Sequence, residues 1–442
     1  MEKSIFIYEK NNTGVTLKKF ISGGETVEIP AHAEDAGDLT GLPVTVVGAE
    51  CFKENGIMIT SIIVPETVTI LEHDAFAYCV SLQSLKLPES IEVLGADYLI
   101  ASGLEQAYIP ASVNTIDRPE LIDREFIVAP DNDIFSTDGF GLYETRNGVK
   151  TLIAVNASDE REGYSIAPGT QKTAYGALRD ISTVKSLEIP AELDMIDEGS
   201  LSFTGGRASG SYGFEEITVS PENKRFLIKY DCLCEKTDGK ALKLIRYFGG
   251  KECALGDDVK RIGNGCFKNT RLEEITFTDT DLNVGDEAFS GCLLKYAHSA
   301  DGDIFFGDED QFTVEKFVQG FGRDGKLFDY TEYDEFLTKQ YLTEPRIRMI
   351  CSRLKNPVGI DEDVRNLLKR RLGDSMPEVI ELLAVEHNCA TLGDIGELGL
   401  FTAENIDEYI GLAGKLEEKE MTAWFMSYKN RNIGFKDELT FL

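Results

Sequence analysis

The stretch Ala75-Phe76-Ala77-Tyr78-Cys79-Val80-Ser81-Leu82-Gln83-Ser84-Leu85-Lys86-Leu87-Pro88 decides the fold of this 442-residue chain. It contains an aromatic residue after a small one, a polar loop, and a short segment of alternating apolar residues that ends in proline. The pattern occurs on either side as well, and its closing prolines, Pro65, Pro88 and Pro110, lie 23 and 22 residues apart. A fixed period of this length is typical of a solenoid in which each repeat contributes a short strand.

The pattern resumes later in the chain, at Gly176-Ala177-Leu178, Gly265-Cys266-Phe267 and Glu287-Ala288-Phe289. A longer unit interrupts the series twice, at about residues 126–165 and 215–255. Five positions of its first copy correspond to positions 91 residues later: Val128 and Val219, Asn132 and Asn223, Phe135 and Phe226, Leu142 and Leu233, Tyr143 and Cys234. This agreement at one offset predicts two related hairpin-like insertions in the solenoid.

A single repeat cannot fold by itself. Ordering about 23 residues costs roughly 1–2 kcal/mol per residue in backbone entropy. Burial of some four Leu, Ile or Phe side chains returns only about 1.5–3 kcal/mol for each. Neighbouring repeats must therefore cover the apolar rows and complete the strand hydrogen bonds, which predicts a quasi-one-dimensional array.

The stretch from Ala75 to Pro88, together with Ile91-Glu92-Val93-Leu94-Gly95, resembles the BspA-type leucine-rich repeats of bacteria over about residues 25–298. The resemblance implies a leucine-rich repeat solenoid with a parallel strand ladder. It also implies kinship with surface adhesion and interaction proteins, many of which are secreted. Residues 1–24 are then expected to form an N-terminal capping segment.

After about residue 330 the hydrophobic period becomes helical. Ile347, Ile350, Cys351 and Leu354 fall at i, i+3, i+4 and i+7, on one face of a helix. Related triplets follow: Val379, Leu382 and Leu383, and then Met421, Trp424 and Phe425. With shorter helices expected at 361–372 and 402–413, we predict a connector at 299–330 and an all-α domain of helical hairpins at 331–442.

Two segments have the composition of helix starts. Thr343-Glu344-Pro345 and Ser375-Met376-Pro377-Glu378 place proline in a first helical turn. The second also matches a capping box, in which Ser375 and Glu378 each bond the other's backbone amide. The whole chain is therefore expected to be an α+β repeat protein, with the solenoid first and the helices last.

Acidic and basic residues are unbalanced, since 77 Asp and Glu against 45 Lys and Arg give a net charge of −32. Such a surface repels phosphate backbones and anionic lipid, so no nucleic-acid partner is expected. No run of about 18 apolar residues occurs, so no membrane insertion is expected.

Two observations favour a cytoplasmic location. The apolar stretch Ile5-Phe6-Ile7-Tyr8 ends at Glu9 and is too short for a signal-peptide core. The nine cysteines are an odd number, and several fill small repeat positions where alanine stands in other copies. Cysteine there behaves as a compact apolar residue, so we predict buried, reduced thiols rather than a disulfide framework.

Motifs that would carry catalysis or cofactor binding are incomplete. The histidines His32, His73, His298 and His387 include no pair at helical zinc spacing. The segment from Gly320 to Gly325 has the spacing of a dinucleotide fingerprint, but no strand–turn–helix unit is expected around it. The acidic group Asp301, Asp303, Asp308, Glu309 and Asp310 does not match an EF-hand loop. We therefore expect no catalytic residue, no cofactor and no metal.

The favoured function is a non-enzymatic scaffold that binds a protein partner through the outward side chains of the ladder, because a strand ladder is a long, rigid surface. Apolar residues point inward and the residues between them point outward. One outward row contains Ile63, Lys86, Tyr108, Glu188, Thr218 and Thr276. The second contains Ser61, Ser84, Gln106, Ser186, Glu216 and Glu274. Both rows are expected on one face of one parallel sheet.

The composition of the rows changes along the chain. Ile63, Lys86 and Tyr108 mix apolar, basic and aromatic side chains, as binding hot spots do. The glutamates of the later repeats would favour a basic partner, with an affinity that falls as salt rises. Three alternatives remain open: a merely solvated sheet face, an enzyme whose active site is assembled only in three dimensions, and a self-assembling structural protein.

Overall fold

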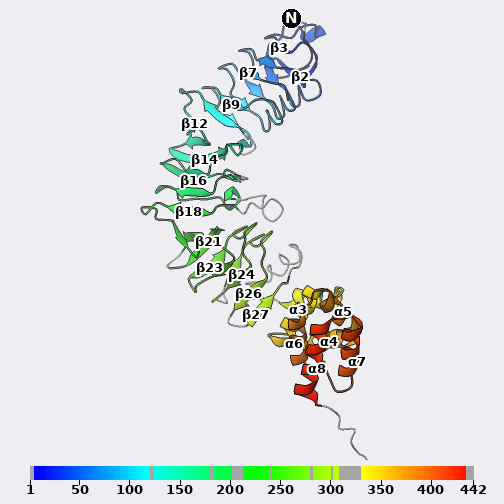
Figure 1. Cartoon of the computed structure of the whole chain (residues 1–442). Helices are drawn as coiled ribbons and strands as arrows, with labels where there is room; N and C mark the ends of the chain where they lie inside the picture. Colours follow the sequence, from blue (N-terminus) through cyan, green and yellow to red (C-terminus); the bar gives the residue numbers. More distant parts are fainter. Residues whose placement is uncertain are drawn as a thin grey trace, which may run out of the picture. The chain divides into compact units, whose positions relative to one another are not determined.

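The computed structural model describes residues 4–119, 124–179, 181, 183–201, 213–237, 240–278, 282–299, 302–307 and 330–434. The chain divides into two compact units, residues 1–228 and residues 229–442 (Figure 1). Short strands build the first unit and the beginning of the second, and the α-helices all follow residue 329 in the part of the chain that the structure describes.

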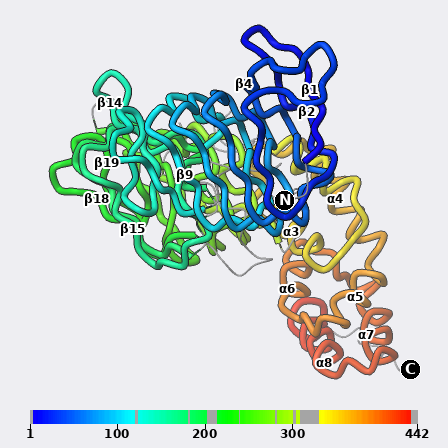
Figure 2. The backbone as a smooth tube through the Cα atoms, turned by 90° about the horizontal axis from the view of Figure 1, so that it is seen from above, coloured from blue at the N-terminus to red at the C-terminus, as the bar shows by residue number. Residues whose placement is uncertain are grey.

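Two strand ladders run along the first repeats, and each repeat contributes a strand to both. The first ladder begins with an antiparallel hairpin of β1 (Ile5–Lys10) and β2 (Val15–Ser22). It continues in parallel with β4 (Val44–Val47), β6 (Ile70–Leu71), β8 (Val93–Leu94) and β10 (Thr115–Ile116). The second is parallel and contains β3 (Thr26–Glu28), β5 (Ser61–Ile63) and β7 (Ser84–Lys86). A short 3₁₀ helix, η1 (Gly37–Leu39), lies between β3 and β4. The windings that these strands share are stacked one against the next in Figure 2.

Aromatic rings connect successive repeats inside the core. The rings of Phe20, Phe52 and Phe76 follow one another with centroids 5.1 and 5.4 Å apart. In the second unit the rings of Phe267 and Phe289 stack at 4.8 Å. All five residues are buried. The recurring aromatic position of the sequence therefore packs against its own counterpart in the next repeat, which a lone repeat could not do.

The turn before the small-aromatic pair has a left-handed backbone. The φ angles are 55° at Glu50, 56° at Asp74 and 56° at Asp97. In the second unit they are 61° at Gly265 and 51° at Glu287. Glycine adopts this conformation freely and aspartate tolerates it better than most residues. This constraint explains why glycine or an acid precedes the pair in the sequence pattern.

The first long unit forms a β-hairpin within the array. Its strands are β12 (Phe135–Thr137), β13 (Gly141–Arg146) and β14 (Val149–Val155), which are antiparallel, and β16 (Thr170–Thr173), which is parallel to β14. The outward ladder continues around it as β9 (Gln106–Ile109), β11 (Glu125–Val128), β15 (Gly163–Ser165), β17 (Ser186–Ile189) and β18 (Glu216–Val219). A 3₁₀ helix, η3 (Glu198–Leu201), lies between β17 and β18.

The asparagines of the two long units have the same role. The Asn132 side chain donates to the carbonyls of Pro110 (2.8 Å) and Val113 (3.0 Å), and its oxygen accepts from the amides of Ile134 (2.9 Å) and Phe135 (2.7 Å). Asn223 makes the matching four bonds, at 2.8, 2.9, 2.9 and 2.7 Å. The 91-residue offset is thus a repeat of structure, and each asparagine ties a long unit to the repeat before it.

In the second unit β20 (Cys232–Lys236) and β21 (Leu242–Tyr247) form the second hairpin, and β23 (Val259–Ile262) and β25 (Asn283–Val284) follow in parallel. β19 (Phe226–Lys229) spans the boundary between the units. The outward ladder contains β22 (Glu252–Ala254), β24 (Glu274–Thr276) and β26 (Tyr296–Ser299). β27 (Gly302–Phe305) folds back antiparallel to β26 and ends the parallel series.

Helices occupy the described residues from 330 onward. They are α2 (Tyr330–Lys339), α3 (Glu344–Lys355), α4 (Glu362–Asp374), α5 (Met376–Val385), α6 (Cys389–Glu397), α7 (Ile406–Lys415) and α8 (Lys419–Tyr428), followed by the π-helical turn η5 (Lys429–Ile433). α3, α4, α5, α7 and α8 coincide with predicted helices, whereas α2 and α6 were not predicted. In α6, Gly393 and Gly396 weaken the helical pattern of the sequence.

The two predicted helix starts have different outcomes. Thr343 caps α3, since its hydroxyl accepts from the amide of Arg346 at 3.4 Å. The capping box at Ser375 is wrong, because the Ser375 side chain makes no capping hydrogen bond. Ser375 is also the C-cap of α4, with φ −100° and ψ 16°, and this backbone is not the extended one that an N-cap requires.

The helices begin against the last strand of the second unit. The Tyr333 hydroxyl of α2 donates to the Phe305 carbonyl of β27 at 2.6 Å. Arg353 of α3 forms a two-point ion pair with Asp334 of α2, at 2.6 and 2.9 Å, and the Arg353 side chain is only 1% exposed. Its guanidinium also lies over the Tyr330 ring, 3.8 Å from the centroid. A paired, stacked charge of this kind fixes α2 against α3.

We predict that Asn132→Ala and Asn223→Ala each destabilise the protein by about 2–4 kcal/mol, because each removes four hydrogen bonds and leaves buried backbone groups unpaired. The aspartate variants should be worse, since a carboxylate cannot donate to the two carbonyls. Chemical denaturation followed by circular dichroism measures this loss. Asn12→Ala, at an exposed position, is the control, and equal stability of all three alanine variants would contradict the assigned role.

Candidate functional site

The outward side chains of the first repeats stand in register. Ser61 of β5 pairs with Ser84 of β7, and Ile63 pairs with Lys86. β3, which was not predicted as part of the rows, adds Thr26 and Glu28. Ser84 and Lys86 are exposed, and Ser61 and Ile63 are half-buried. Both predicted rows therefore run without interruption across β3, β5 and β7.

The next two strands present an aromatic and several polar groups. Gln106 and Tyr108 of β9 pair with Glu125 and Ile127 of β11. The Gln106 amide donates to the Glu125 carboxylate at 2.7 Å, and the Tyr108 hydroxyl donates to Glu89 at 3.1 Å. Partial burial and the neighbouring Glu89 carboxylate raise the pKa of Tyr108. The Tyr108 phenol is thus held in place as a neutral, hydrogen-bonded group.

The rows continue after the first hairpin unit. Ser186 of β17 pairs with Glu216 of β18, and Glu188 pairs with Thr218. β15 precedes them, and its Ser165 hydroxyl lies 2.5 Å from the Glu188 carboxylate. Glu188, Glu216 and Thr218 are exposed, so this part of the rows presents two carboxylates to solvent.

In the second unit Glu274 and Thr276 of β24 pair with Tyr296 and His298 of β26. The His298 Nδ1 lies 2.9 Å from Asp303, and its Nε2 lies 3.7 Å from Glu274. Tyr296 stacks on the His298 ring with centroids 5.9 Å apart. The sequence offers no second histidine at zinc-ligand spacing from His298, and the fold places this residue at the end of the rows between two carboxylates.

None of the twelve predicted row residues is buried. The expectation of one continuous sheet is wrong, because in the described part of the chain the rows lie on four separate sheets. These are β3-β5-β7, β11-β9, β15-β17-β18 and β22-β24-β26-β27. The hairpin units divide the ladder at two places, and a third division lies between β7 and β9, where no insertion occurs.

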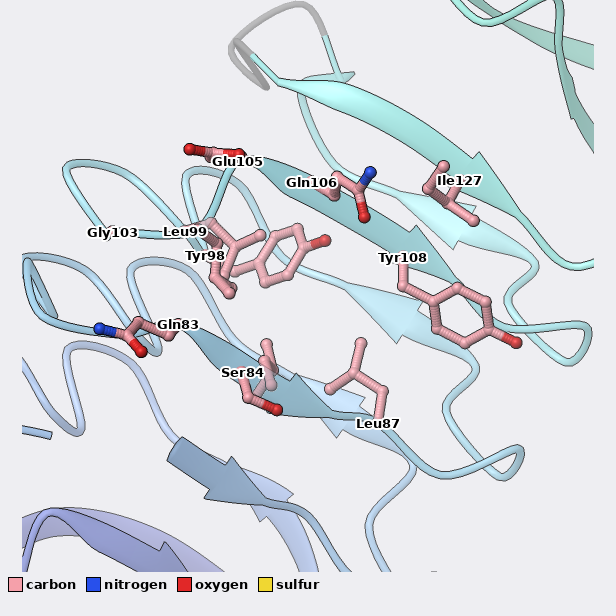
Figure 3. Close-up of a pocket in the computed structure, with 12 residues that line it drawn as sticks. Gln83, Ser84, Leu87, Tyr98, Leu99, Gly103, Glu105, Gln106, Tyr108 and Ile127 are labelled. Atoms are coloured by element: carbon pink, nitrogen blue, oxygen red, sulfur yellow. The ribbon is translucent and has the colours of Figure 1, made fainter. Parts of the chain in front are cut away.

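A cavity of about 600 Å³ lies at the division between β7 and β9 (Figure 3). Tyr98 and Leu99 line it, together with Gln83, Ser84, Gln106 and Tyr108 from the two strand segments. Tyr98 is only 1% exposed, and its hydroxyl has no hydrogen-bond partner among the described residues. Burial raises the pKa of Tyr98, so the phenol stays protonated. This cavity was missed from the sequence, although a tyrosine at a small repeat position was a visible signal.

Five strands of the outward ladder were also missed: β3, β11, β15, β22 and β26. β3 precedes Pro30, which has the register position of the closing prolines of β5 and β7. β11 and β15 precede Pro130 and Pro168, which lie one residue later in the register. The signal was present, but the preceding aromatic half of the repeat is degenerate in these copies. A search by a strand followed within a few residues by proline would have found β3, β11 and β15, whereas β22 and β26 have no such proline.

Six copies of the family model for the BspA type leucine rich repeat match the chain, over residues 44–120 and 250–308. These two stretches of the solenoid are BspA-type leucine-rich repeats. The match includes β5, β7 and β9 in the first unit and β24 and β26 in the second. The resemblance noted in the sequence is therefore confirmed for the repeats, and the fold class with it.

Three solved structures are similar to the BspA-type array. A leucine rich cell surface protein from Faecalibacterium prausnitzii is 17% identical, with 66% of this chain and 92% of that chain covered and a TM-score of 0.34. A leucine-rich repeat protein from Bacteroides capillosus is 28% identical, with 29% and 99% covered and a TM-score of 0.25. The pneumococcal vaccine antigen PcpA is 17% identical, with 67% and 87% covered and a TM-score of 0.37. No curated protein matches the chain.

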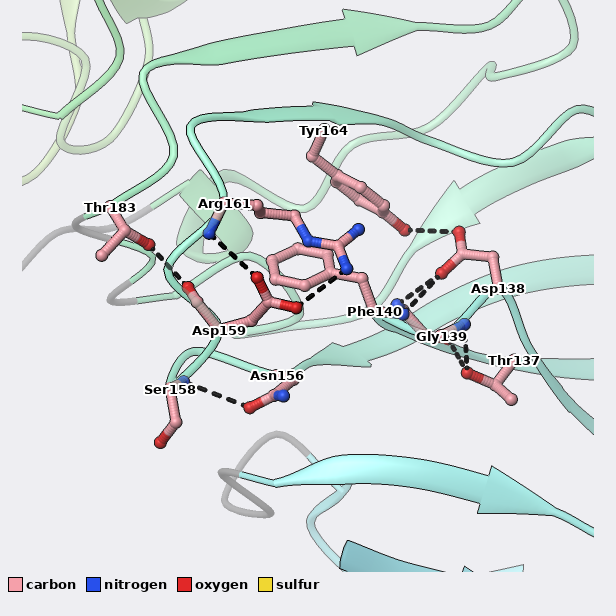
Figure 4. Close-up of polar contacts among 11 residues, drawn as sticks. Thr137, Asp138, Gly139, Phe140, Asn156, Ser158, Asp159, Arg161, Tyr164 and Thr183 are labelled. Atoms are coloured by element: carbon pink, nitrogen blue, oxygen red, sulfur yellow. Dashed lines mark hydrogen bonds and ion pairs between the residues drawn. The ribbon is translucent and has the colours of Figure 1, made fainter. Parts of the chain in front are cut away.

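A polar cluster in the first hairpin unit is centred on the carboxylate of Asp138 (Figure 4). The Asp138 carboxylate accepts from the hydroxyls of Tyr143 (2.7 Å) and Tyr164 (3.1 Å), which are 2.5 Å apart. Its other oxygen accepts from the amides of Phe140 (3.0 Å) and Gly141 (2.7 Å). Every oxygen of the carboxylate is occupied, so the cluster closes the hairpin turn and leaves no site for a substrate.

Arg161 covers one side of this cluster. Its guanidinium lies 4.2 Å from the centre of the Phe140 ring and pairs with Asp159 at 2.8 Å. The ion pair lowers the pKa of Asp159 and raises that of Arg161, so both remain charged. These contacts are those of a structural ion pair that is partly exposed.

The cysteines of the BspA-type repeats are buried, as predicted. The exposed fractions are 1% for Cys51, 0% for Cys79, 0% for Cys266 and 6% for Cys292. Burial raises the pKa of Cys79 to about 12 and that of Cys51 still further. A thiol with so high a pKa is a poor nucleophile and a poor metal ligand at neutral pH. Over the described residues no group of three or more His, Cys, Asp or Glu side chains is arranged to hold a metal ion.

Two motifs that the sequence analysis considered and did not adopt lie wholly or mostly outside the described residues. They are the segment Gly320–Gly325 and four members of the acidic group, Asp301, Asp308, Glu309 and Asp310. The fifth member, Asp303, is described and pairs with His298. In the described part of the chain no helix has the length and apolar character needed to cross a membrane.

We predict that the Asp138 cluster acts in stability rather than in catalysis. Burial raises the pKa of Tyr143 and Tyr164 in the folded protein. Their stabilising effect is therefore complete below about pH 10, the pKa of an unfolded tyrosine, and is lost as the pH rises above it. Ultraviolet titration should count the same number of phenolates in the folded wild type and in the folded double variant Tyr143→Phe/Tyr164→Phe. After alkaline unfolding the double variant should show two phenolates fewer than the wild type. Ionisation of both tyrosines in the folded protein near pH 10 would contradict the role.

Proposed function

We propose that this chain is a non-enzymatic scaffold that binds a protein partner through the outward rows of its BspA-type ladder. The observation that carries the proposal is the openness of the rows: all twelve predicted residues are exposed or half-buried on short parallel strands with fixed spacing. Leucine-rich repeat proteins generally have binding or scaffold roles, and this chain shares their repeats.

The ladder is well suited to a macromolecular partner. Backbone hydrogen bonds between strands hold the rows rigidly, so little conformational entropy is lost when a partner covers them. Separate sheets carry different chemistry: Ile63 and Lys86 lie on the first, and Glu188 and Glu216 lie on the third. A partner that spans both would need an apolar patch and a basic patch at matching positions.

The side chains that could do chemistry are occupied by structural contacts. His298 has two carboxylate neighbours, but no described serine, threonine or cysteine is bonded to its ring. The Asp138 cluster is filled by its own tyrosines and backbone amides. These contacts support a binding role over hydrolysis or group transfer, and they give no support to a nucleic-acid partner on so acidic a chain.

We predict that Ile63→Asp, and separately Glu188→Lys with Glu216→Lys, each remove a protein partner that the wild-type chain captures from its native extract. The substitutions place a charge in an apolar contact or reverse the charge of a patch. The free energy of unfolding should fall by about 1–2 kcal/mol for Ile63→Asp, at a half-buried strand position, and change by less than about 1 kcal/mol at the exposed glutamates. Affinity capture with quantitative mass spectrometry measures the loss, and thermal unfolding checks the fold.

The control is Met58→Asp, which adds the same charge at an apolar residue that is 68% exposed and belongs to neither row. A partner lost with Met58→Asp as well would indicate a general charge effect. A partner retained by both row variants would show that the rows are not the binding surface.

We also propose that the scaffold works in a reducing compartment, the cytoplasm. Eight of the nine cysteines are buried as free thiols, and only Cys389 is half-buried. The similar protein from Faecalibacterium prausnitzii is described as a cell surface protein, so the alternative location is outside the cell. The oxidation state of the cysteines in the native host distinguishes the two.

We predict slow alkylation of Cys51, Cys79, Cys266 and Cys292 in the native protein and faster alkylation of Cys389, since reaction at a buried thiol needs local unfolding. Mass spectrometry of the labelled peptides, with and without denaturant, measures both rates. A disulfide between any two of the four repeat cysteines would contradict both the proposed compartment and the core packing.

A further inference from the structure

The junction between β5 and β7 shows how repeats are normally joined. The Thr60 carbonyl accepts from the amides of Gln83 (2.8 Å) and Ser84 (3.1 Å), and the Val64 amide donates to the Lys86 carbonyl (3.0 Å). The junction between β3 and β5 has the same bonds, and so does the junction between β15 and β17. Three bonds at fixed positions therefore close a regular junction on the outward side.

At the junction between β7 and β9 this closure is missing. The equivalent bonds would run from the amides of Glu105 and Gln106 to the Gln83 carbonyl, and from the Leu87 amide to the Tyr108 carbonyl. Within the described residues 81–119 no backbone hydrogen bond joins β7 to β9, and the two strands belong to different sheets. Each strand thus has an unpaired edge, and the two edges face each other across the cavity in Figure 3.

Tyr98 accounts for the gap. The amides of Phe52 and Phe76 donate to the carbonyls of Ala75 (3.2 Å) and Tyr98 (2.9 Å), so Tyr98 occupies the position of Ala75 one repeat later. In the repeat before, the position belongs to Cys51. A phenol in place of a methyl or thiol group overfills the space beneath the strands, and the strands above it are kept apart.

The side chains around the gap confirm that it is open. Leu85 is the inward residue of β7, and its counterparts Ile62 and Ala107 are both 0% exposed. Leu85 itself is only half-buried and lines the cavity. The gap therefore contains apolar surface and the buried Tyr98 hydroxyl, which has no hydrogen-bond partner among the described residues. It also contains two rows of backbone groups that nothing in the described chain covers.

We propose that an extended peptide segment of a protein partner lies between β7 and β9 and completes the ladder as an added strand. The proposal rests on the proposed function as a protein-binding scaffold and names the site. Unpaired strand edges recognise another main chain, which supplies amides and carbonyls at the same spacing. An apolar side chain of the segment packs on Leu85, Leu99 and Tyr98, and its neighbours point to solvent.

Charge selects the kind of segment. Glu105 lines the cavity, and Glu89 and Glu125 lie on the adjoining backbone beside Tyr108 and Gln106. Two cations lie close by: Lys86 is exposed on β7, and the Arg124 guanidinium donates to the Leu99 carbonyl at 2.8 Å. The three carboxylates outnumber them and favour lysine or arginine on either side of the apolar residue. The occupant is therefore a short, extended, basic-apolar-basic segment rather than a small neutral metabolite.

The first test needs only the free protein and nuclear magnetic resonance or mass spectrometry of amide exchange. We expect the amides of Leu87 and Gln106 to exchange at least about tenfold faster than those of Val64 and Ser84, which are hydrogen-bonded in the regular junctions. Equal protection of all four amides would show that the ladder is closed and would overturn the proposal.

The second test adds acetylated, amidated pentapeptides X-Lys-Leu-Lys-X, in which X is Val, Thr or Tyr, at up to about 1 mM. The lysines stand directly beside the inward leucine, so their side chains point to solvent. Binding should slow exchange at Leu87 and Gln106 by at least about tenfold. Versions that carry N-methyl groups at both X residues lack two main-chain donors and should not bind. Absence of protection by every parent peptide, or equal binding of the methylated ones, would overturn the added strand.

Variants locate the site. Tyr98→Ala restores the small residue of the other repeats, so it should protect Leu87 and Gln106 without peptide and abolish peptide binding. Glu105→Lys should weaken binding of the lysine peptides by about threefold, whereas Glu160→Lys, an equal change at an exposed residue elsewhere, should not. The site is contradicted if the peptides bind Tyr98→Ala and Glu105→Lys as tightly as they bind the wild type. If Tyr98→Ala folds poorly, Glu105→Lys alone provides this test.

The row variants separate this proposal from the broader one. Ile63→Asp and Glu188→Lys should leave peptide protection at the gap unchanged, because neither residue lines the cavity. Loss of the captured partner without any peptide binding would support the rows and reject the gap. Peptide binding with full retention of the partner by the row variants would support the gap and reject the rows.

Discussion

Each repeat of this chain leaves both edges of its short strand unpaired, and the hydrogen bonds that satisfy those edges come from the repeats on either side. The Thr60 carbonyl, which accepts two amides from the next repeat, is one example of a bond that no isolated repeat can make. Aromatic stacking follows the same rule, since Phe52 packs against Phe20 and Phe76 of its neighbours. The stability of the array is therefore a property of junctions, and its ends must be closed by other structure.

The chain closes its second unit by changing the direction of the backbone. β27 pairs antiparallel to β26, and the helices begin against it through Tyr333 and the Arg353–Asp334 pair. Inside the array the two long units use one device, an asparagine whose amide bonds the carbonyls of the preceding repeat while its oxygen holds the next turn. These features explain how a ladder can be interrupted without leaving buried backbone groups unpaired.

The junction at Tyr98 is an exception to this rule that no inserted hairpin explains, and the proposed peptide site depends on it. A large residue at a small position separates two strands and leaves an apolar, partly polar cavity between unpaired edges. Local disagreement between a sequence and the fold around it is expected at functional sites, where the rest of the structure compensates for the strain. In the proposals made above, the outward rows form a broad binding surface, and the gap is the place where a partner's main chain is recognised.

The sequence by itself determined the repeat, its period, the 91-residue correspondence and the alternation of inward and outward residues, because these depend on spacing along the chain. It also located most helices after residue 330, although the glycines of α6 concealed one of them and the backbone of Ser375 excluded a predicted cap. The tertiary structure alone decided which strands pair. The periodicity predicts a closed junction between β7 and β9, and the structure has an open one at Tyr98, where other repeats have alanine or cysteine. Periodicity indicates which face a side chain occupies, but it does not indicate whether the volume of that side chain fits beneath the next strand.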